Sequence, residues 1–244
     1  MCLVALTLAV IVSALARRAE AYRPFIATDA AVVDAKEVEI ELGYFNLDRS
    51  HGSNTIATPN LVVNYGVAKR LELVSEFRLD VSPYVDIVDP GLFVKAVLKE
   101  GVLQDKPGSS VAVEAGPLFP STLHGERGVG FQAVGIVSAK LAPVMVHVNG
   151  GGGLNRGGQL FGSWGVIGEL PLTSRLRLVS EVDGEVAEGE RPNNSALVGF
   201  IWQPTSANVF LDVAVRRGIS HAAPDWQFTI GMTFGFPLPM VSQQ

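Results

Sequence analysis

Large apolar side chains alternate with small or polar ones along most of this chain, and this pattern restricts what the chain can fold into. In residues 226–236 every second residue is large and apolar, and glutamine, threonine or glycine stands between. The same alternation recurs in residues 38–44, 71–79, 176–183 and 208–216. A period of two is typical of a β-strand with one apolar and one polar face, whereas a helix repeats every 3.6 residues. The sequence therefore predicts an all-β protein.

Turn-forming residues divide the chain into about twelve predicted strands, most of them ten residues or longer. Strands of soluble sheets have roughly five or six residues, whereas a tilted strand that crosses a bilayer needs roughly 9–11. Strand length therefore favours a single antiparallel up-and-down transmembrane β-barrel, whose closure leaves no unpaired edge in hydrocarbon. The predicted strands are residues 36–47, 54–66, 69–80, 90–100, 109–119, 128–140, 143–154, 159–171, 174–186, 194–203, 206–217 and 225–237.

The predicted connections are alternately short and long, as in bacterial outer-membrane barrels with short periplasmic turns and longer external loops. Among the expected external loops, residues 81–89 and 120–127 would select solutes by size. Two connections depart from the pattern. Residues 101–108 are long where a turn is expected, and residues 156–158 are short where a loop is expected.

The N-terminus predicts export through the inner membrane. Residues 1–16 are an apolar run, and Ala19-Glu20-Ala21 fits the small-residue rule for signal-peptide cleavage, so residues 1–21 are expected to be removed. The alternative is an uncleaved anchor, although the run is shorter than the roughly 20 residues of a spanning helix. Cys2, the only cysteine, lies in this segment, so the mature chain would form no disulfide.

The mature chain then divides into three parts. Residues 22–35 are an N-terminal lead-in, expected either in the lumen or along the periplasmic rim. Residues 36–237 form the barrel domain, and residues 238–244 are a C-terminal tail.

Charged residues of both signs occupy the face predicted to point into the barrel. They could line a water-filled pore and set its selectivity, or they could pair across the lumen and close a structural interior. A barrel of about twelve strands lies between the filled eight-stranded and the open sixteen-stranded barrels, so both interpretations stand. The predicted lumen residues are Glu37, Glu39, Glu41, Glu72, Glu76, Arg78, Lys95, Lys99, Glu114, His147, Arg175, Arg177, Glu181, Asp183, Asp212 and Arg216.

Glu37, Glu39 and Glu41 share one strand face, so these stacked anions need water or counter-charges. The expected counter-charges are Arg78, Lys95, Arg175 and Arg177. The opposite, apolar face of the last strand is expected to contact lipid through Trp226, Phe228, Ile230, Met232, Phe234 and Phe236.

The sequence contains no motif that predicts catalysis, a cofactor or a metal. The glycine run at residues 150–153 lacks the lysine of a phosphate-binding loop, and the four histidines lack metal-ligand spacing. No serine and histidine are matched on the lipid-facing side, as a barrel lipase would require. The net charge of −5 gives no footprint for nucleic acid. We therefore expect no enzyme, no cofactor and no nucleic-acid partner.

Three stretches resemble a known family. They are RPFIATDAAVVDAKEVEIELGYF (residues 23–45), DPGLFVKAVLKEG (residues 89–101) and the aromatic last strand. Together they resemble the bacterial outer-membrane family named after the MetA pathway of phenol degradation. The resemblance implies a barrel that moves small, often aromatic, compounds, and it carries over no binding residues. The tail PLPMVSQQ departs from the family, whose barrels usually end near an aromatic residue.

The main hypothesis is an outer-membrane channel for passive or facilitated diffusion of small solutes, with weak ion preference because both signs line the lumen. One alternative is a non-conducting structural or surface-binding barrel. The other is a soluble exported β-sandwich. The expected partners are outer-membrane lipid, the barrel insertion machinery and an unidentified small solute.

Overall fold

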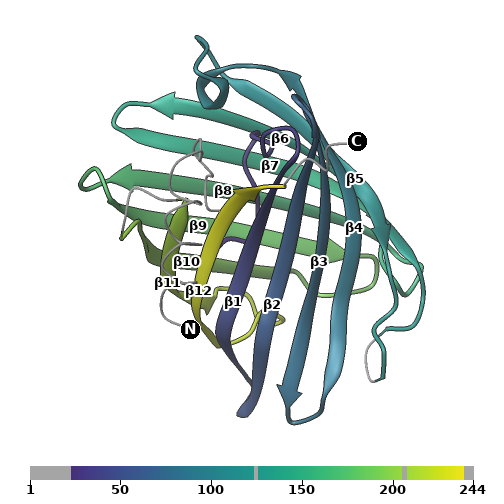
Figure 1. Ribbon diagram of the computed structural model, residues 1–244. Coiled ribbons are helices and arrows are strands. Elements are labelled where there is room, and N and C mark those ends of the chain that lie inside the picture. Colours follow the sequence, from purple (N-terminus) through teal and green to yellow (C-terminus); the bar gives the residue numbers. More distant parts are fainter. Residues whose placement is uncertain (1–22, 124–125, 205–207, 239–244) are drawn as a thin grey trace, which may run out of the picture.

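A computed structural model describes residues 23–123, 126–204 and 208–238, in which twelve strands pair in chain order. The last strand pairs with the first, which closes an antiparallel barrel (Figure 1). The predicted signal peptide and residues 239–244 of the tail lie outside the described residues. The strands are β1 (Glu37–Ser50), β2 (Ser53–Ala68), β3 (Leu71–Ser82), β4 (Asp86–Lys99), β5 (Ser110–Leu118), β6 (Gly130–Leu141), β7 (Val144–Leu154), β8 (Leu160–Pro171), β9 (Leu176–Ala187), β10 (Asn193–Trp202), β11 (Val209–Gly218) and β12 (Trp226–Pro237).

The structure confirms the predicted all-β fold, a closed up-and-down barrel. The β-sandwich alternative is wrong, because two packed sheets would keep free edges and this sheet has none. The largest error in a boundary lies at β4, which begins at Asp86 because Asp86 and Ile87 pair with Asp80 and Leu79 of β3. The predicted external loop at residues 81–89 is therefore a connection of residues 83–85 only.

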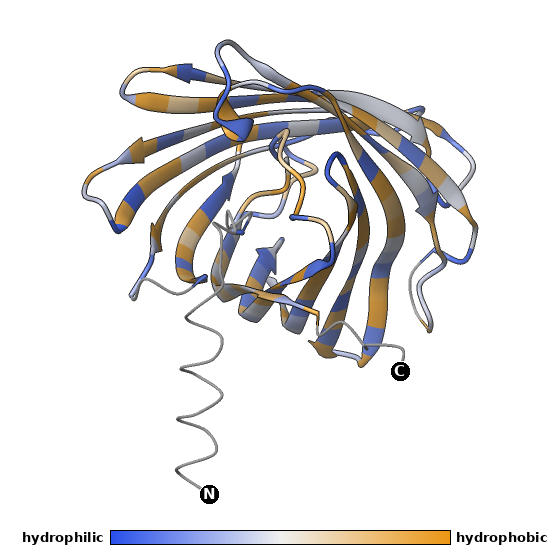
Figure 2. Cartoon of the chain, turned by 45° about the horizontal axis from the view of Figure 1, so that its top comes forward, coloured by the Kyte–Doolittle hydropathy of each residue, from blue (hydrophilic) through white to orange (hydrophobic). Residues whose placement is uncertain are grey.

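The two faces of the barrel wall differ as the alternation predicts. Along β12, Phe228 is 43% exposed and Ile230 54% on the outer face, whereas Thr233 is fully buried on the inner face. Figure 2 shows the alternating hydropathy along the other strands as well. Large apolar residues are also exposed on the other strands, for example Val94, Phe131, Val166, Val198 and Val213. An apolar surface of this extent marks an interaction surface, and a closed barrel is one of the two structures that can span a bilayer.

One irregularity changes which residues of β1 point inward. The register between β1 and β12 shifts between Gly43 and Phe45, so Tyr44 is an extra residue and is 69% exposed. A bulge of this kind moves the following residues to the opposite parity. As a result Glu39 and Glu41 are buried on the inner face before the bulge, and Asn46 is buried there after it.

Two connections are folded against the barrel. The β4–β5 connection, unexpectedly long in the sequence, contains the short 3-10 helix η1 (Val102–Gln104). Arg156 of the β7–β8 connection ties the start of the β5–β6 connection to β4: its Nε donates to the Phe119 carbonyl at 2.6 Å, and its Nη2 donates to the Pro90 carbonyl at 3.1 Å. No helix of the described residues is long and apolar enough to cross a membrane.

Candidate functional site

Residues 23–35, here called the lumen segment, lie inside the ring of strands rather than along its rim (Figure 2). Their contacts follow the order of the strands in the barrel, from β12 and β11 through β9, β8, β7 and β6 to β3 and β2. An extended segment inside a barrel must find acceptors for its backbone N–H groups. The wall supplies these acceptors from its polar side chains.

The lumen segment begins with an arginine fixed in the lumen. The Arg23 side chain donates from Nη2 to Thr229 Oγ1 at 2.5 Å, and its Nε lies 3.4 Å from Asp212 Oδ2. Arg23 is only 6% exposed, and Gly43 gives it room, because a Cβ there would lie 2.5 Å from Arg23 Nη1. Two residues later Phe25 packs against an apolar cluster of β9–β11. The N-terminal end of the segment is therefore held both by charge and by apolar contact.

A buried ion-pair cluster holds the next two residues. The Glu181 carboxylate accepts hydrogen bonds from the backbone N–H groups of Ile26 and Ala27 at 3.1 Å and 2.7 Å. Arg216 lies between Glu181 and Asp183 and forms ion pairs with both. Because a buried carboxylate needs such compensation, Arg216 makes Glu181 available as an acceptor for the segment.

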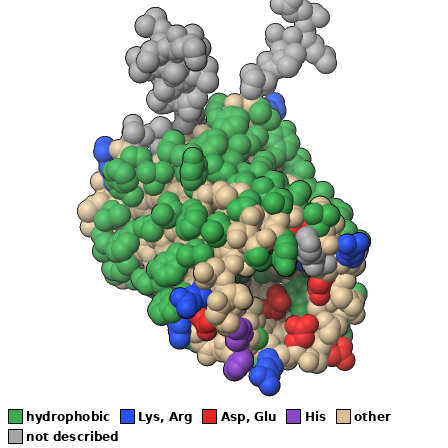
Figure 3. Space-filling model, turned by 90° about the horizontal axis from the view of Figure 1, so that it is seen from below, with side chains coloured by type: hydrophobic (Ala, Val, Ile, Leu, Met, Phe, Trp, Pro, Cys, Tyr) green, Lys and Arg blue, Asp and Glu red, His purple; other side chains and the backbone are tan. Residues whose placement is uncertain are grey.

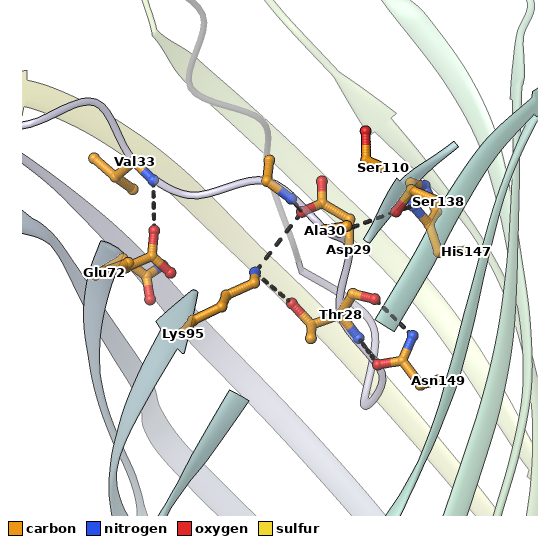
Figure 4. A network of polar contacts seen from close by, with 12 residues as sticks. Thr28, Asp29, Ala30, Val33, Glu72, Lys95, Ser110, Ser138, His147 and Asn149 are labelled. Carbon is orange, nitrogen blue, oxygen red and sulfur yellow. Dashed lines mark hydrogen bonds and ion pairs between the residues drawn. The ribbon is translucent and has the colours of Figure 1, made fainter. Parts of the chain in front are cut away.

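The centre of the lumen segment is bonded to both sides of the barrel (Figure 4). Thr28 and Asn149 of β7 form a reciprocal pair, with Thr28 N donating to Asn149 Oδ1 at 3.0 Å and Asn149 Nδ2 donating to the Thr28 carbonyl at 2.7 Å. From β4, Lys95 Nζ donates to Thr28 Oγ1 at 3.1 Å and lies 3.7 Å from Asp29 Oδ1. Asn149 and Lys95 thereby fix the segment from two separate parts of the wall.

The second half of the segment continues along the wall to β1. Ala30 N donates to Ser138 Oγ at 2.9 Å, and Val33 N donates to Glu72 Oε2 at 2.5 Å. The Ala30 carbonyl accepts from Gln104 of η1 at 3.0 Å, so the long β4–β5 connection also binds the segment. These contacts account for the length of that connection.

Ser138, His147 and Glu169 form a hydrogen-bonded chain that resembles a catalytic triad in composition. His147 Nδ1 lies 2.8 Å from Ser138 Oγ, and His147 Nε2 lies 3.2 Å from Glu169 Oε1. However, Ser138 is fully buried, its hydroxyl already accepts the Ala30 N–H, and none of the three residues lines the cavity. A nucleophilic serine must reach a substrate carbonyl. These three hydrogen-bonded residues therefore position the lumen segment.

The lumen keeps a cavity of about 1370 Å³ beside the segment, and residues 23–28 and 31–34 form part of its lining. The lining reaches both ends of the barrel. At the end where β1 begins it includes Lys69 and Lys140, and at the opposite end it includes Asp48 and Asn193. In Figure 3, which views one end of the molecule, acidic side chains are visible inside a hollow. A solute path along the barrel axis is consistent with this geometry.

The structure places the sixteen predicted lumen residues in different surroundings. The ten that line the cavity are Glu37, Glu39, Glu41, Glu72, Glu76, Arg78, Lys95, Glu114, Asp183 and Arg216. The six that do not line it are Lys99, His147, Arg175, Arg177, Glu181 and Asp212.

Those six residues have three kinds of surroundings. Lys99 and Arg175 are exposed at the end of the barrel where β1 begins. His147, Glu181 and Asp212 are buried and lie next to the lumen segment or bonded to it. Arg177 pairs with Glu169 at 2.8 Å. Strand parity identifies which side chains point inward, but it cannot show that a segment covers some of them.

Three of the four expected counter-charges for the glutamates of β1 form ion pairs with other carboxylates, and the fourth, Arg175, is exposed. Arg78 pairs with Asp48 and Asp80, each at 2.9 Å, and Arg177 pairs with Glu169. Lys95 binds the lumen segment through Asp29. These pairs join nearby strands to each other or a strand to the lumen segment, so they leave the cavity open rather than bridging it.

One ion-pair cluster lies outside the spanning strands, at the β4–β5 connection. Glu100 accepts from Lys106 and from Arg70, the latter at 2.7 Å, and lies 3.4 Å from Lys69 Nζ. Hydrogen bonds from Lys106 and Arg70 lower the pKa of Glu100 to about 2. The carboxylate therefore remains ionised at neutral and mildly acidic pH.

The six predicted lipid-facing residues of β12 all lie on its outer parity. Trp226 and Phe228 stack with ring centroids 6.4 Å apart, as do Phe234 and Phe236 at 6.3 Å. Ile230 is the most exposed of the set, and Met232 is partly exposed. The described residues contain no group of three or more His, Cys, Asp or Glu that could hold a metal ion.

Comparison with known proteins gives structural likeness only. No family model matches the chain, and no curated protein matches it. An outer-membrane channel of Pseudomonas putida F1 matches with a TM-score of 0.60 at 11% identity, over 84% of this chain and 97% of that one. Weaker matches are a loop-deleted OmpT of Vibrio cholerae (TM-score 0.43, 11% identity, 82% and 100% covered) and the DcaP channel of Acinetobacter baumannii (0.36, 10%, 84% and 100%). The first of these shows that the chain has the fold of an outer-membrane barrel, and the MetA-pathway resemblance stays a prediction.

Proposed function

We propose that this protein is an outer-membrane channel for passive or facilitated diffusion of small solutes. The observation that carries the proposal is the lumen cavity, whose lining includes residues at both ends of the barrel. A pore needs such a path along the lumen, and the ion pairs of Arg78, which lines the cavity, join nearby strands and leave the path open. The apolar outer surface and the predicted export signal support an outer-membrane location.

In this proposal the lumen segment limits the size of the solute that can pass, and the loops contribute less to that limit. The connection at residues 83–85 is too short to cover the mouth, whereas the segment occupies the lumen and lines the cavity. The backbone of the segment is bonded to four polar side chains of the wall, Glu181, Asn149, Ser138 and Glu72. A segment held at this many points would set one defined aperture.

The identity of the solute is proposed from the sequence. The resemblance of residues 23–45 and 89–101 to the MetA-pathway family favours small, aromatic compounds as cargo. Transport of this kind is passive and involves no enzyme activity or cofactor. The further partners in this proposal are outer-membrane lipid around the wall and the barrel insertion machinery during assembly.

A non-conducting barrel is the second candidate, and the dense bonding of the lumen segment is the observation that favours it. In that case the segment is a permanent plug, and the barrel acts through its external surface. The two candidates differ in whether ions cross the folded protein.

Reconstitution of the mature protein into planar bilayers tests the proposal. We expect discrete conductance steps as single barrels insert. Folding is checked in the same sample by the shift in gel mobility between unheated and heated protein. A folded preparation that inserts and stays silent over many trials would favour the plugged barrel.

A further inference from the structure

Five carboxylates gather on one part of the lumen wall, which we call the acidic face. Glu39 and Glu41 come from β1, Glu72 and Glu76 from β3, and Glu114 from β5, and all five line the cavity. Strand parity and the bulge in β1 place them on the inner side. The acidic face therefore borders the path that a solute would follow.

The strand register fixes how these carboxylates are spaced. Glu41 pairs with Val62 of β2, which pairs with Glu76 of β3, so the two glutamates lie on one row two strands apart. Neighbouring strands are about 4.8 Å apart, which puts their backbones about 10 Å from each other. On another row Lys95 of β4 stands between Glu72 and Glu114. The carboxylates therefore spread over a surface rather than forming a compact cluster around one point.

Cations at the acidic face are fewer than its carboxylates. On the acidic face Lys95 is the cation supplied by the intervening strand, and it also binds Thr28 and Asp29. Arg78 pairs with two aspartates, and Arg23 pairs with Asp212. Carboxylates therefore outnumber cations at the acidic face, and rings of acidic side chains are how cation channels select.

Glu39 indicates that the acidic face is built for a ligand. It is only 3% exposed, and its Oε2 has no hydrogen-bond partner among the described residues. Its neighbour Glu41 accepts from Asn64 at 2.9 Å, and Glu72 accepts from the lumen segment. A buried carboxylate oxygen without a partner is costly, so a donor or cation that enters the cavity would relieve that cost.

An apolar surface lies next to the carboxylates. Val62, Val74 and Phe93 line the same cavity, and Val74 and Phe93 belong to one buried cluster. The absence of a side chain at Gly91 lets the Phe93 ring lie over the backbone of β4. A Cβ at Gly91 would be 2.5 Å from the ring and 3.3 Å from Glu76 Oε1. An aromatic ring and a carboxylate thus meet at one point of the wall.

From this arrangement we infer that the channel selects small organic cations, in which an ammonium group is attached to an apolar, ring-sized skeleton. The ammonium would bind the acidic face, and the skeleton would lie against Phe93 and Val62. A metal ion fits less well, because no group of three ligands among the described residues could hold one. The inference rests on the proposed channel function and adds the class of solute.

The test uses the mature protein in planar bilayers, with benzylammonium and benzoate as probes of similar size and opposite charge. In a KCl gradient, we expect a reversal potential that shows a severalfold preference for K⁺ over Cl⁻, rather than the weak ion preference that the sequence predicts. We expect benzylammonium to interrupt the current in brief blocks at concentrations where benzoate does not. Both effects should fall several-fold in the Glu39→Gln/Glu41→Gln double variant and in the separate Glu76→Gln variant.

Glu190→Gln is the matched control, because Glu190 is an exposed glutamate of the β9–β10 connection and does not line the cavity. It should keep both the ion preference and the benzylammonium blocks. Gel mobility shows which variants fold, and Glu76→Gln carries the test if the double variant does not. Conductance steps without cation preference, or equal block by benzoate, would overturn the inference and leave the channel intact. Absence of any conductance would instead refute the channel, and the inference with it.

Discussion

The reciprocal pair between Thr28 and Asn149 allows a direct test of whether the lumen segment limits the pore. Asn149→Ala removes two hydrogen bonds, of 3.0 Å and 2.7 Å, from the centre of the segment. Each contributes about 1 kcal/mol net, so together about 2 kcal/mol of the binding between segment and wall is lost. Since about 1.4 kcal/mol is a factor of ten, the undocked segment should become roughly 30 times more populated.

Single-channel recording measures this shift. If the docked segment narrows the pore, Asn149→Ala should show frequent transitions to a state of higher conductance that is rare in the wild type. A small, uniform increase in the size of every conductance step would reflect a wider cavity instead, because truncating Asn149 also enlarges the cavity that it lines. The dwell time in the higher state is therefore the quantity to compare.

Asn155→Ala is the control for this experiment. Asn155 also forms a reciprocal pair, donating to Gln159 Oε1 at 2.9 Å and accepting from Gln159 N at 2.8 Å. The pair lies in the β7–β8 connection and does not bind the lumen segment. Identical dwell-time distributions in the two variants would refute the idea that the segment sets the aperture.

Three further variants test other parts of the structure. Gly165→Ala should displace the lumen segment and lengthen the high-conductance dwell times, because the new Cβ would lie 2.6 Å from the Cβ of Ala27 in the segment. Gly162→Ala is its control, because a Cβ there meets nothing closer than 3.8 Å. Arg216→Ala should lower the free energy of unfolding by about 3–5 kcal/mol in urea titrations, because it leaves the buried carboxylates of Glu181 and Asp183 without their counter-charge. Arg217→Ala, at an exposed position, should lower the free energy of unfolding by less than about 1 kcal/mol. The pKa of Glu100 falls from 4.5 to about 2 on folding, so its ion pairs stabilise the β4–β5 connection above pH 4.5 and are lost as the pH approaches 2. Glu100→Gln should therefore speed amide exchange in residues 101–108 at pH 6, and the difference from wild type should narrow only below pH 4.5.

The fold could be predicted because each strand carries its own signal. In β12 the alternation of Phe228, Ile230 and Met232 with threonine and glycine predicts both the strand and which residues lie on each of its faces. Closure then follows from physics, since an open edge in hydrocarbon leaves backbone groups unpaired. The boundary of β4 was missed because Asp89 and Pro90 read as turn residues, whereas the paired β3 strand extends the ladder past them.

The arrangement of the lumen could be predicted only in part. Parity correctly indicated that Glu39 and Glu41 point inward, but the partners of such side chains depend on which strands face each other and on the bulge at Tyr44. Residues 23–35 show neither strand nor helix periodicity, so no local signal distinguishes a lumen position from a rim position. For the same reason the sequence predicts that loops limit solute size, whereas we propose that the segment does.

The polar residues of the wall acquire a second explanation once the lumen segment is in place. An inward carboxylate or amide is usually attributed to contact with water or solute. Here Glu181 and Ser138 instead accept backbone N–H groups of the segment, and Asn149 and Glu72 do the same while they also line the cavity. Inward polarity therefore serves two purposes, which mutation can separate. Loss of a segment acceptor should change how often the pore widens, whereas loss of an acidic-face carboxylate that holds no segment atom, such as Glu76, should change which ions pass at an unchanged width.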